Sequence, residues 1–351
     1  MISFIKFYGS ILFLCIVVFD VNAEVTQADI DHAIQVYKDG DPQKSFQLFT
    51  EMAEQGNAQA QTHLGTMYIK GIGTRENIEE GLRWLKTAAD NNFPDAHYHL
   101  GTIYDNGLGV TVDKAAAVRW YESATRLKSP DGTFNLGNTY FMGDGVPVDY
   151  ERALELFRQA ANLDVNRAMF NIGIMYFKGL AVEKDDEEAF RWIKRSAEKQ
   201  LPQGMFALAT MYDEGIGVVK SQQDAFKYFK QAAEAGHLKS QTTVGYRYLT
   251  GTGVSQNLNE ALKWTKKAAE AGEARAQYNL GWMSIRGVGM LKYEALGYAW
   301  IYIASLNRLP DAVADVHKVR AGGVIDTDSI TEGKEIAQKL IKKHKFLVEA
   351  H

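Results

Sequence analysis

The chain has 351 residues, of which 46% are hydrophobic, 23% charged and 11% aromatic, and these fractions exclude a wholly disordered protein. Its 39 Lys and Arg residues are outnumbered by 43 Asp and Glu residues, for a net charge of −4. This balance argues against a nucleic-acid-binding protein, which needs a basic face to neutralise phosphates.

Residues 1–23 have the pattern of a secretory signal peptide. Lys6 supplies a positive charge, residues 7–19 form an apolar run, and Val21-Asn22-Ala23 fits a cleavage site for small residues. A retained membrane anchor is the alternative, but this run is shorter than the ~20 residues that span a bilayer. We therefore expect an exported protein, periplasmic or secreted, with no membrane span after cleavage. Because Cys15 lies within the signal, the mature chain would have no cysteine, which favours a bacterial protein over a eukaryotic lumenal one.

Residues 24–57 are predicted to form an N-terminal capping unit of the tetratricopeptide type. Tyr37 lies on a first helix, Gly40-Asp41 forms a turn, and Phe49 and Ala53 lie at helical spacing on a second helix.

Residues 58–309 contain seven copies of a 36-residue repeat. The first recurring position is a glycine in six copies and Ala209 in the seventh. The recurring positions are Gly65, Gly101, Gly137, Gly173, Gly245 and Gly281, then Tyr68, Tyr104, Tyr140, Tyr176, Tyr212 and Tyr248, and then Trp84, Trp120, Trp192, Trp264 and Trp300. No insertion interrupts the copies, so seven equal structural units are predicted.

Each copy is predicted to be a pair of helices. A glycine within a helix costs about 1 kcal/mol relative to alanine, so Gly65 and its equivalents indicate close approach of a neighbouring helix. Gly71 is placed to end the first helix with a positive φ. The second helices are predicted to begin at the N-cap residues Asn77, Asp113, Asp149, Asp185, Ser221 and Asn257. Glu80, Glu188 and Glu260, three positions later, predict capping boxes.

Residues 310–351 are predicted to be C-terminal capping helices. Pro310 ends the last repeat, and Thr327 or Ser329 is expected to cap a final helix that reaches about Phe346. Lysines near the end of this helix would favour its dipole.

The repeat reads A-x-A-Q-x-x-L-G-x-x-Y-x-x-G-x-G-V-x-x-D-x-x-x-A-x-x-W-x-x-x-A-A and resembles the Sel1-like repeat family, which is related to the tetratricopeptide repeats. The resemblance implies an all-α, right-handed solenoid of stacked antiparallel helix pairs whose first helices line a concave groove. It also implies a non-catalytic scaffold for protein–protein interaction. In an exported bacterial member, the partners would be envelope proteins, or host proteins met during entry and trafficking.

The groove geometry of the related fold defines candidate partner-binding residues in this sequence. Aromatic side chains would anchor a partner, and asparagine amides would bond its backbone. The candidates are Tyr98, His99, Phe134, Asn135, Asn138, Phe141, Phe170, Asn171, Phe177, Phe206, Tyr246, Tyr278, Asn279 and Trp282. We call the residues at one repeat position a column. The alternative is that the column of aromatic residues packs between repeats.

Other functions have weaker support in the sequence. Ser196-x-x-Lys199 matches the S-x-x-K of penicillin-recognising enzymes, which leaves an enzyme acting on peptidoglycan or β-lactams as a rival hypothesis, but its companion motifs are missing. A eukaryotic lumenal adaptor is a further rival, since the family also serves there. We expect no cofactor and no metal site, because His97 and His99 point to different faces of a helix.

Overall fold

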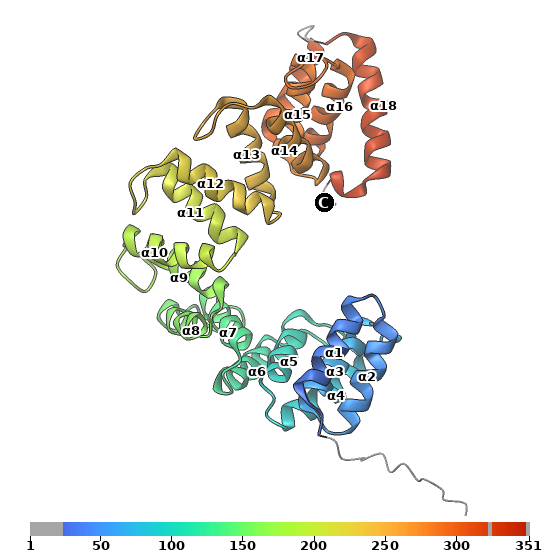
Figure 1. Cartoon of the computed structure of the whole chain (residues 1–351), viewed down its shortest axis with the longest axis vertical. Helices are drawn as coiled ribbons and strands as arrows, with labels where there is room; N and C mark the ends of the chain where they lie inside the picture. Colours follow the sequence, from blue (N-terminus) through green and yellow to red (C-terminus); the bar gives the residue numbers. More distant parts are fainter. Residues whose placement is uncertain (1–23, 322–324, 349–351) are drawn as a thin grey trace, which may run out of the picture. The chain divides into compact units, whose positions relative to one another are not determined.

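The computed structural model describes residues 24–321 and 325–348, so the expected signal peptide at residues 1–23 lies outside the described part. The described residues form 18 α-helices and one short 3₁₀ turn, with no strand among them (Figure 1). None of these helices is long and apolar enough to cross a lipid bilayer. The predicted all-α class is therefore confirmed.

The helices follow the repeat spacing closely. Those before the seven repeats are α1 (Gln27–Lys38) and α2 (Pro42–Glu54). The first helices of the repeats are α3 (Ala58–Lys70), α5 (Pro94–Asn106), α7 (Pro130–Met142), α9 (Asn166–Lys178), α11 (Pro202–Glu214), α13 (Leu238–Thr250) and α15 (Ala274–Arg286). The second helices are α4 (Ile78–Asp90), α6 (Lys114–Arg126), α8 (Tyr150–Asn162), α10 (Asp186–Glu198), α12 (Gln222–Glu234), α14 (Leu258–Glu270) and α16 (Glu294–Leu306). The chain ends with α17 (Pro310–Ala321), α18 (Thr327–Lys343) and the 3₁₀ turn η1 (Lys345–Leu347).

The chain divides into two compact units, with the boundary between Trp120 and Tyr121. Within each unit, the two helices of a repeat pack on each other, and each pair packs on the pair that follows. This arrangement is the stacked helix-pair solenoid that the repeat spacing predicts.

The repeat glycines permit close helix contact, as predicted. A methyl group added at Gly281 would lie 2.6 Å from Ile301 Cγ1 and 2.8 Å from the carbonyl oxygen of Gly297. Further along the repeat, Gly217 has a φ of +64°, and a methyl group there would overlap the carbonyl oxygen of Asp186. One glycine therefore brings two helices together, and the other brings a loop onto the preceding helix pair.

The six predicted N-cap residues are confirmed, because each side chain accepts a hydrogen bond from the backbone N–H three residues later. The predicted capping boxes are wrong. Glu80 binds Arg83, Glu188 binds Arg191 and Glu260 binds Lys263, so the carboxylates face basic side chains one turn ahead. The predicted caps of the final helix, Thr327 and Ser329, are also wrong. The N-cap is Asp326, whose carboxylate accepts from the Ser329 N–H at 2.7 Å, and the helix ends at Lys343 rather than at about Phe346.

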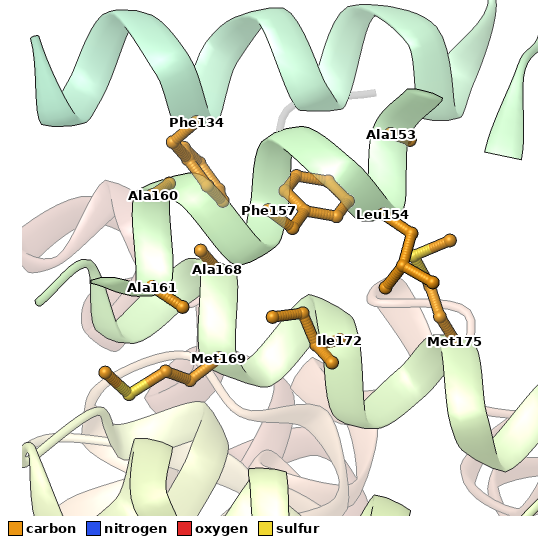
Figure 2. Packing of buried hydrophobic residues seen from close by; sticks show 10 residues of the cluster. All are labelled: Phe134, Ala153, Leu154, Phe157, Ala160, Ala161, Ala168, Met169, Ile172 and Met175. Atoms are coloured by element: carbon orange, nitrogen blue, oxygen red, sulfur yellow. The ribbon is translucent and has the colours of Figure 1, made fainter. Parts of the chain in front are cut away.

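Small residues interlock with large ones in the core. Figure 2 shows Phe134 and Phe157 next to each other, with ring centroids 5.8 Å apart. Ala160 and Ala168 are fully buried beside them, which lets neighbouring helices approach closely. The tryptophan column is less uniform. Trp264 and Trp300 are buried, whereas the other tryptophans of the column are half-buried.

Candidate functional site

An apolar pocket of about 450 Å³ lies between α9 and α11 in the second unit. Its size is that of a site for a small molecule or for a side chain of a bound peptide. Most of the wall is hydrophobic: Phe170, Gly173, Ile174, Phe177, Ala189, Ile193, Phe206, Ala207, Met211 and Ile216. Five polar residues, Gln203, Thr210, Glu214, His237 and Lys239, complete it.

The pocket exists where two positions depart from the residue types that other repeats carry. Ile174 occupies a position that is threonine or asparagine in Thr66, Thr102, Asn138 and Thr210. Ala207 occupies a position that is histidine or asparagine in His63, His99, Asn135, Asn171 and Asn279. An apolar residue and a small one therefore replace polar side chains, which opens and lines the pocket. Ile174 and Ala207 were not among the candidate residues. Their departure from the residue types of the other repeats is the signal in the sequence that could have identified them.

Core contacts hold the pocket walls in place. The Phe206 ring lies 5.5 Å from that of Phe229, which is buried, and 4.8 Å from the His237 ring. Phe177 is 37% exposed, and the Lys184 ammonium lies 5.4 Å from its ring centroid. The predicted residues Phe170, Phe177 and Phe206 are thus brought together around one cavity.

Charged side chains mark different parts of the pocket rim. Lys239 and Glu214 both line the pocket and are exposed. Lys239 comes from the start of α13, whereas Glu214 is the last residue of α11. The pocket therefore presents a positive and a negative group beside an apolar centre.

His237 connects the pocket to the cap of α13. Its Nδ1 atom accepts a hydrogen bond from the Ser240 N–H at 3.3 Å, which requires a neutral imidazole. Burial lowers the pKa of His237 below its ordinary value, and the positive charge of Lys239 lowers it further.

Acidification is therefore expected to weaken the second unit. Because the pKa of His237 is lower in the folded chain, its stabilisation is complete above the ordinary value of 6.5 and is lost as pH falls towards the folded pKa. Loss of this cap is expected to cost about 1 kcal/mol. Urea unfolding at pH 7.5 and pH 5 measures this loss. Between these pH values, the free energy of unfolding should decrease less in His237→Asn than in the unchanged chain, because the asparagine amide caps the helix at both. If the free energy of unfolding decreases equally in both proteins, the pH dependence comes from other groups. His63 is one such group, because burial lowers its pKa too.

A second group of predicted residues lies beside a smaller cavity of about 140 Å³. Tyr246, Asn279 and Trp282 line it together with Leu249 and Arg286. Tyr246 is 56% exposed, and the Arg286 guanidinium lies 4.8 Å from the Trp282 ring centroid. Residues at the same repeat positions of the first helices line both cavities.

Several predicted residues make contacts within the fold. Phe134 is only 5% exposed, and the Arg167 guanidinium covers its ring at 4.5 Å, so it belongs to the core rather than to an open face. Phe141 packs on Phe157, with ring centroids 6.1 Å apart. The Tyr278 hydroxyl donates to Asp315 Oδ2 at 2.7 Å. Phe134 and Tyr278 therefore contact residues outside their own repeat, whereas Phe141 packs within its own.

The predicted asparagines form an amide contact between successive repeats. Asn171 Nδ2 donates to Asn138 Oδ1 at 3.0 Å, and Asn135 Nδ2 donates to the Tyr121 hydroxyl at 3.3 Å. In the first unit, Tyr98 and His99 are half-buried, and their rings lie 5.0 Å apart. These side chains are therefore distributed along the first helices and do not join the apolar pocket.

Ser196 is placed as a packing residue. Its hydroxyl is buried and donates to the Asn166 carbonyl oxygen at 3.0 Å, and a methyl group at Gly204 would lie 2.6 Å from that hydroxyl. Lys199 pairs with Asp164 at 2.8 Å. The serine and the lysine of the S-x-x-K match are thus each bound to a different partner.

Comparison with known proteins gives a consistent result. The family model for the Sel1 repeat matches residues 32–57, 58–93, 94–129, 130–165, 166–201, 202–237, 239–273 and 274–307. A crystal structure of a Sel1 repeat protein from Oxalobacter formigenes is 29% identical, covers 84% of this chain and 87% of its own, and has a TM-score of 0.67.

Two further relatives share the repeat. The structure of c5321, a protective antigen of uropathogenic Escherichia coli strains with an SLR fold, is 25% identical over 93% of this chain and 80% of its own, with a TM-score of 0.50. A sel1-like repeat-containing protein, L18, of Acanthamoeba polyphaga mimivirus is 42% identical over 40 residues, which span 11% of this chain and only 7% of that relative. Sel1 repeats are generally non-catalytic scaffolds that mediate protein interactions. The helix pairs, the repeat glycines and the eight matched segments together show that this chain belongs to the Sel1 repeat family.

Proposed function

We propose that this protein is a non-catalytic scaffold that holds a partner protein through an apolar anchor in the pocket between α9 and α11. The observation that supports this proposal is the pocket itself, whose three phenylalanines and aliphatic walls border a charged rim. A pocket that is mostly apolar, with a few polar groups, suits an aromatic or aliphatic side chain.

The rim charges narrow the chemistry of the partner. Lys239 favours an acidic residue on one side of the anchor, and Glu214 favours a basic residue on the other. Gln203 and Glu214 lie 11 residues apart on α11, which corresponds to about 16 Å along the helix axis. An extended peptide covers that length with about five residues. The proposed ligand is thus a short extended segment with an acidic end, an apolar centre and a basic end.

We further propose that the protein acts outside the cytoplasm, on an envelope or a host partner. The pattern of residues 1–23 supports export. The likeness to c5321, which is described as a protective antigen, supports contact with a host. Fractionation of cells that express the tagged full chain tests export, since a cytoplasmic product of unprocessed mass would contradict it.

Substitution of two residues tests the pocket. Ile174→Thr with Ala207→Asn gives the pocket the residue types that other repeats carry at the same positions, so folding should be retained. The probe is a display library of random peptides, selected on the unchanged chain and then measured on both proteins. We expect the selected peptides to share the acidic–apolar–basic pattern and to bind the double variant at least about tenfold more weakly, because the anchor loses its apolar seat.

Thr243→Asn is the matched control, since it changes the position equivalent to 207 in the next repeat, outside the pocket. It should leave binding unchanged. If the peptides lack an apolar anchor, or if the double variant binds them as tightly as the unchanged chain does, the pocket is not the binding site.

A further inference from the structure

The C-terminal segment of the chain, residues 345–348, is held by two side-chain amides of the last repeat. The Leu347 carbonyl oxygen accepts from Gln277 Nε2 at 3.0 Å and from Asn307 Nδ2 at 2.7 Å. Asn307 Nδ2 also donates to Gln277 Oε1 at 2.9 Å, so the two amides support each other. We call Gly272, Gln277 and Asn307 the C-terminal clamp.

The clamp also accommodates the backbone and the side chain of this segment. A methyl group at Gly272 would lie 2.8 Å from the Phe346 carbonyl oxygen, so the segment runs close over this glycine. The Leu347 side chain is 1% exposed and belongs to the core cluster of Ala269, Ala276, Leu280 and Trp300. The segment is therefore bound by backbone hydrogen bonds and by one buried aliphatic side chain.

The same residues recur six repeats earlier, in the first unit. Gly56, Gln61 and Asn91 correspond to the three residues of the C-terminal clamp, and we call them the N-terminal clamp. The floor is also the same: Ala53, Ala60, Leu64 and Trp84 lie at the positions equivalent to Ala269, Ala276, Leu280 and Trp300. Gln61 Nε2 donates to the Ala53 carbonyl oxygen at 3.1 Å, just as Gln277 Nε2 donates to that of Ala269. The local geometry is thus repeated together with the sequence.

The repeats between the two clamps do not preserve the set. The glutamine position holds His97, Thr133, Met169 and Met205 in four of them. Gln241 restores the glutamine, but Ala271 stands at the asparagine position, and Gln241 Oε1 has no hydrogen-bond partner among the described residues. A complete clamp therefore occurs twice, once in each unit.

The N-terminal clamp differs from its counterpart in having an exposed rim at Gly56 and Asn91, although the Gln61 side chain is only 3% exposed. A methyl group at Gly56 would meet no described residue within 4 Å. Asn91 is exposed, whereas Asn307 is half-buried, and Asn91 Nδ2 lies 3.5 Å from Gln61 Oε1, longer than the 2.9 Å of the occupied clamp. The Gln61 amide has two protons, and the Ala53 carbonyl takes one, so the other can meet an incoming carbonyl oxygen.

We propose that the N-terminal clamp binds an extended segment of a partner protein with the chemistry of residues 345–348, an aliphatic residue next to basic and aromatic ones. Its backbone carbonyl would accept from Gln61 Nε2 and Asn91 Nδ2, as that of Leu347 does in the other clamp. The exposed carboxylates of Glu54 and Asp90, close in sequence to Gly56 and Asn91, complement a basic residue such as Lys345. This site is separate from the pocket between α9 and α11, so either proposal can fail alone.

The chain's own segment supplies the probe. A fluorescently labelled, amidated peptide of residues 343–348, Lys-His-Lys-Phe-Leu-Val, is titrated with the full chain and followed by fluorescence anisotropy. We expect saturable binding to one site per chain. Asn91→Ala and Gln61→Ala should each weaken it about tenfold, because each removes a donor to the peptide carbonyl. Thermal unfolding of both variants confirms that they are folded.

Asn307→Ala is the matched control, because it changes the equivalent amide of the occupied clamp and should leave peptide affinity unchanged. A peptide with aspartate in place of Leu347 should not bind. The proposal is overturned if the peptide fails to bind the unchanged chain, or if Asn307→Ala alters binding while Asn91→Ala does not, since the peptide would then exchange with the chain's own segment. Self-association of the chain that Leu347→Asp abolishes would assign the clamp to a second copy instead and would also overturn it.

Discussion

Replacement of Trp264 by alanine is expected to lower the free energy of unfolding by about 3–5 kcal/mol. Trp264 is 7% exposed and lies in the core cluster formed by α11, α12, α13 and α14, where it packs with Phe229 and Val244. Its indole N–H also donates to Glu260 Oε2 at 3.1 Å. Because repeats are stabilised mainly by contact with their neighbours, the variant should also broaden the transition by uncoupling the repeats on either side.

Urea unfolding followed by circular dichroism measures this loss. Trp192→Ala is the control, since Trp192 occupies the same column but is only half-buried, with the Arg195 guanidinium over its ring at 4.2 Å. Its replacement should cost less than that of Trp264. A loss below about 1 kcal/mol for Trp264→Ala would show that this column does not stabilise the core.

Asp213→Ala is expected to destabilise the second unit by about 2–3 kcal/mol, because it leaves the buried Arg247 without its counter-ion. Arg247 is buried, and its guanidinium pairs with Asp213 at 2.6 Å and donates to Gln222 Oε1 at 3.0 Å. The Asp213 side chain is 30% exposed, which is why we expect less than the loss measured for fully buried pairs.

Replacement of both partners tests whether the ion pair itself or only the volume of the two side chains stabilises the fold. Other repeats carry methionine at the position of Arg247, as in Met175 and Met211, and a large apolar residue at that of Asp213, as in Leu249. Arg247→Met combined with Asp213→Leu is therefore expected to be at least as stable as the unchanged chain. Thermal unfolding tests both variants. A double variant as unstable as Asp213→Ala would show that the ion pair itself is needed.

Local rules were enough to predict the helix pairs. The 36-residue spacing places a glycine, or Ala209, at each close contact and a capping residue at the start of six of the seven second helices, and both depend on neighbours within a repeat. The prediction of capping boxes failed because a surface carboxylate such as that of Glu80 can bind either the backbone N–H of the N-cap residue or a basic side chain one turn ahead. The sequence does not show which of the two it binds. Arg83 takes it in the structure.

The exposure of the aromatic column depends on residues from other repeats, which is why the sequence left it open. Phe134 and Phe170 are the same residue type at the same repeat position. Phe134 is covered by Arg167, 33 residues later, whereas Phe170 borders a pocket that Ile174 and Ala207 help to line. The docking of Leu347 on Gln277 is a still longer contact, across 70 residues. The sequence alone thus determined the repeating helix pairs, because their spacing, caps and glycines act locally. Only the tertiary structure decided which side chains are buried between repeats and which clamp is filled, because these depend on packing between distant segments.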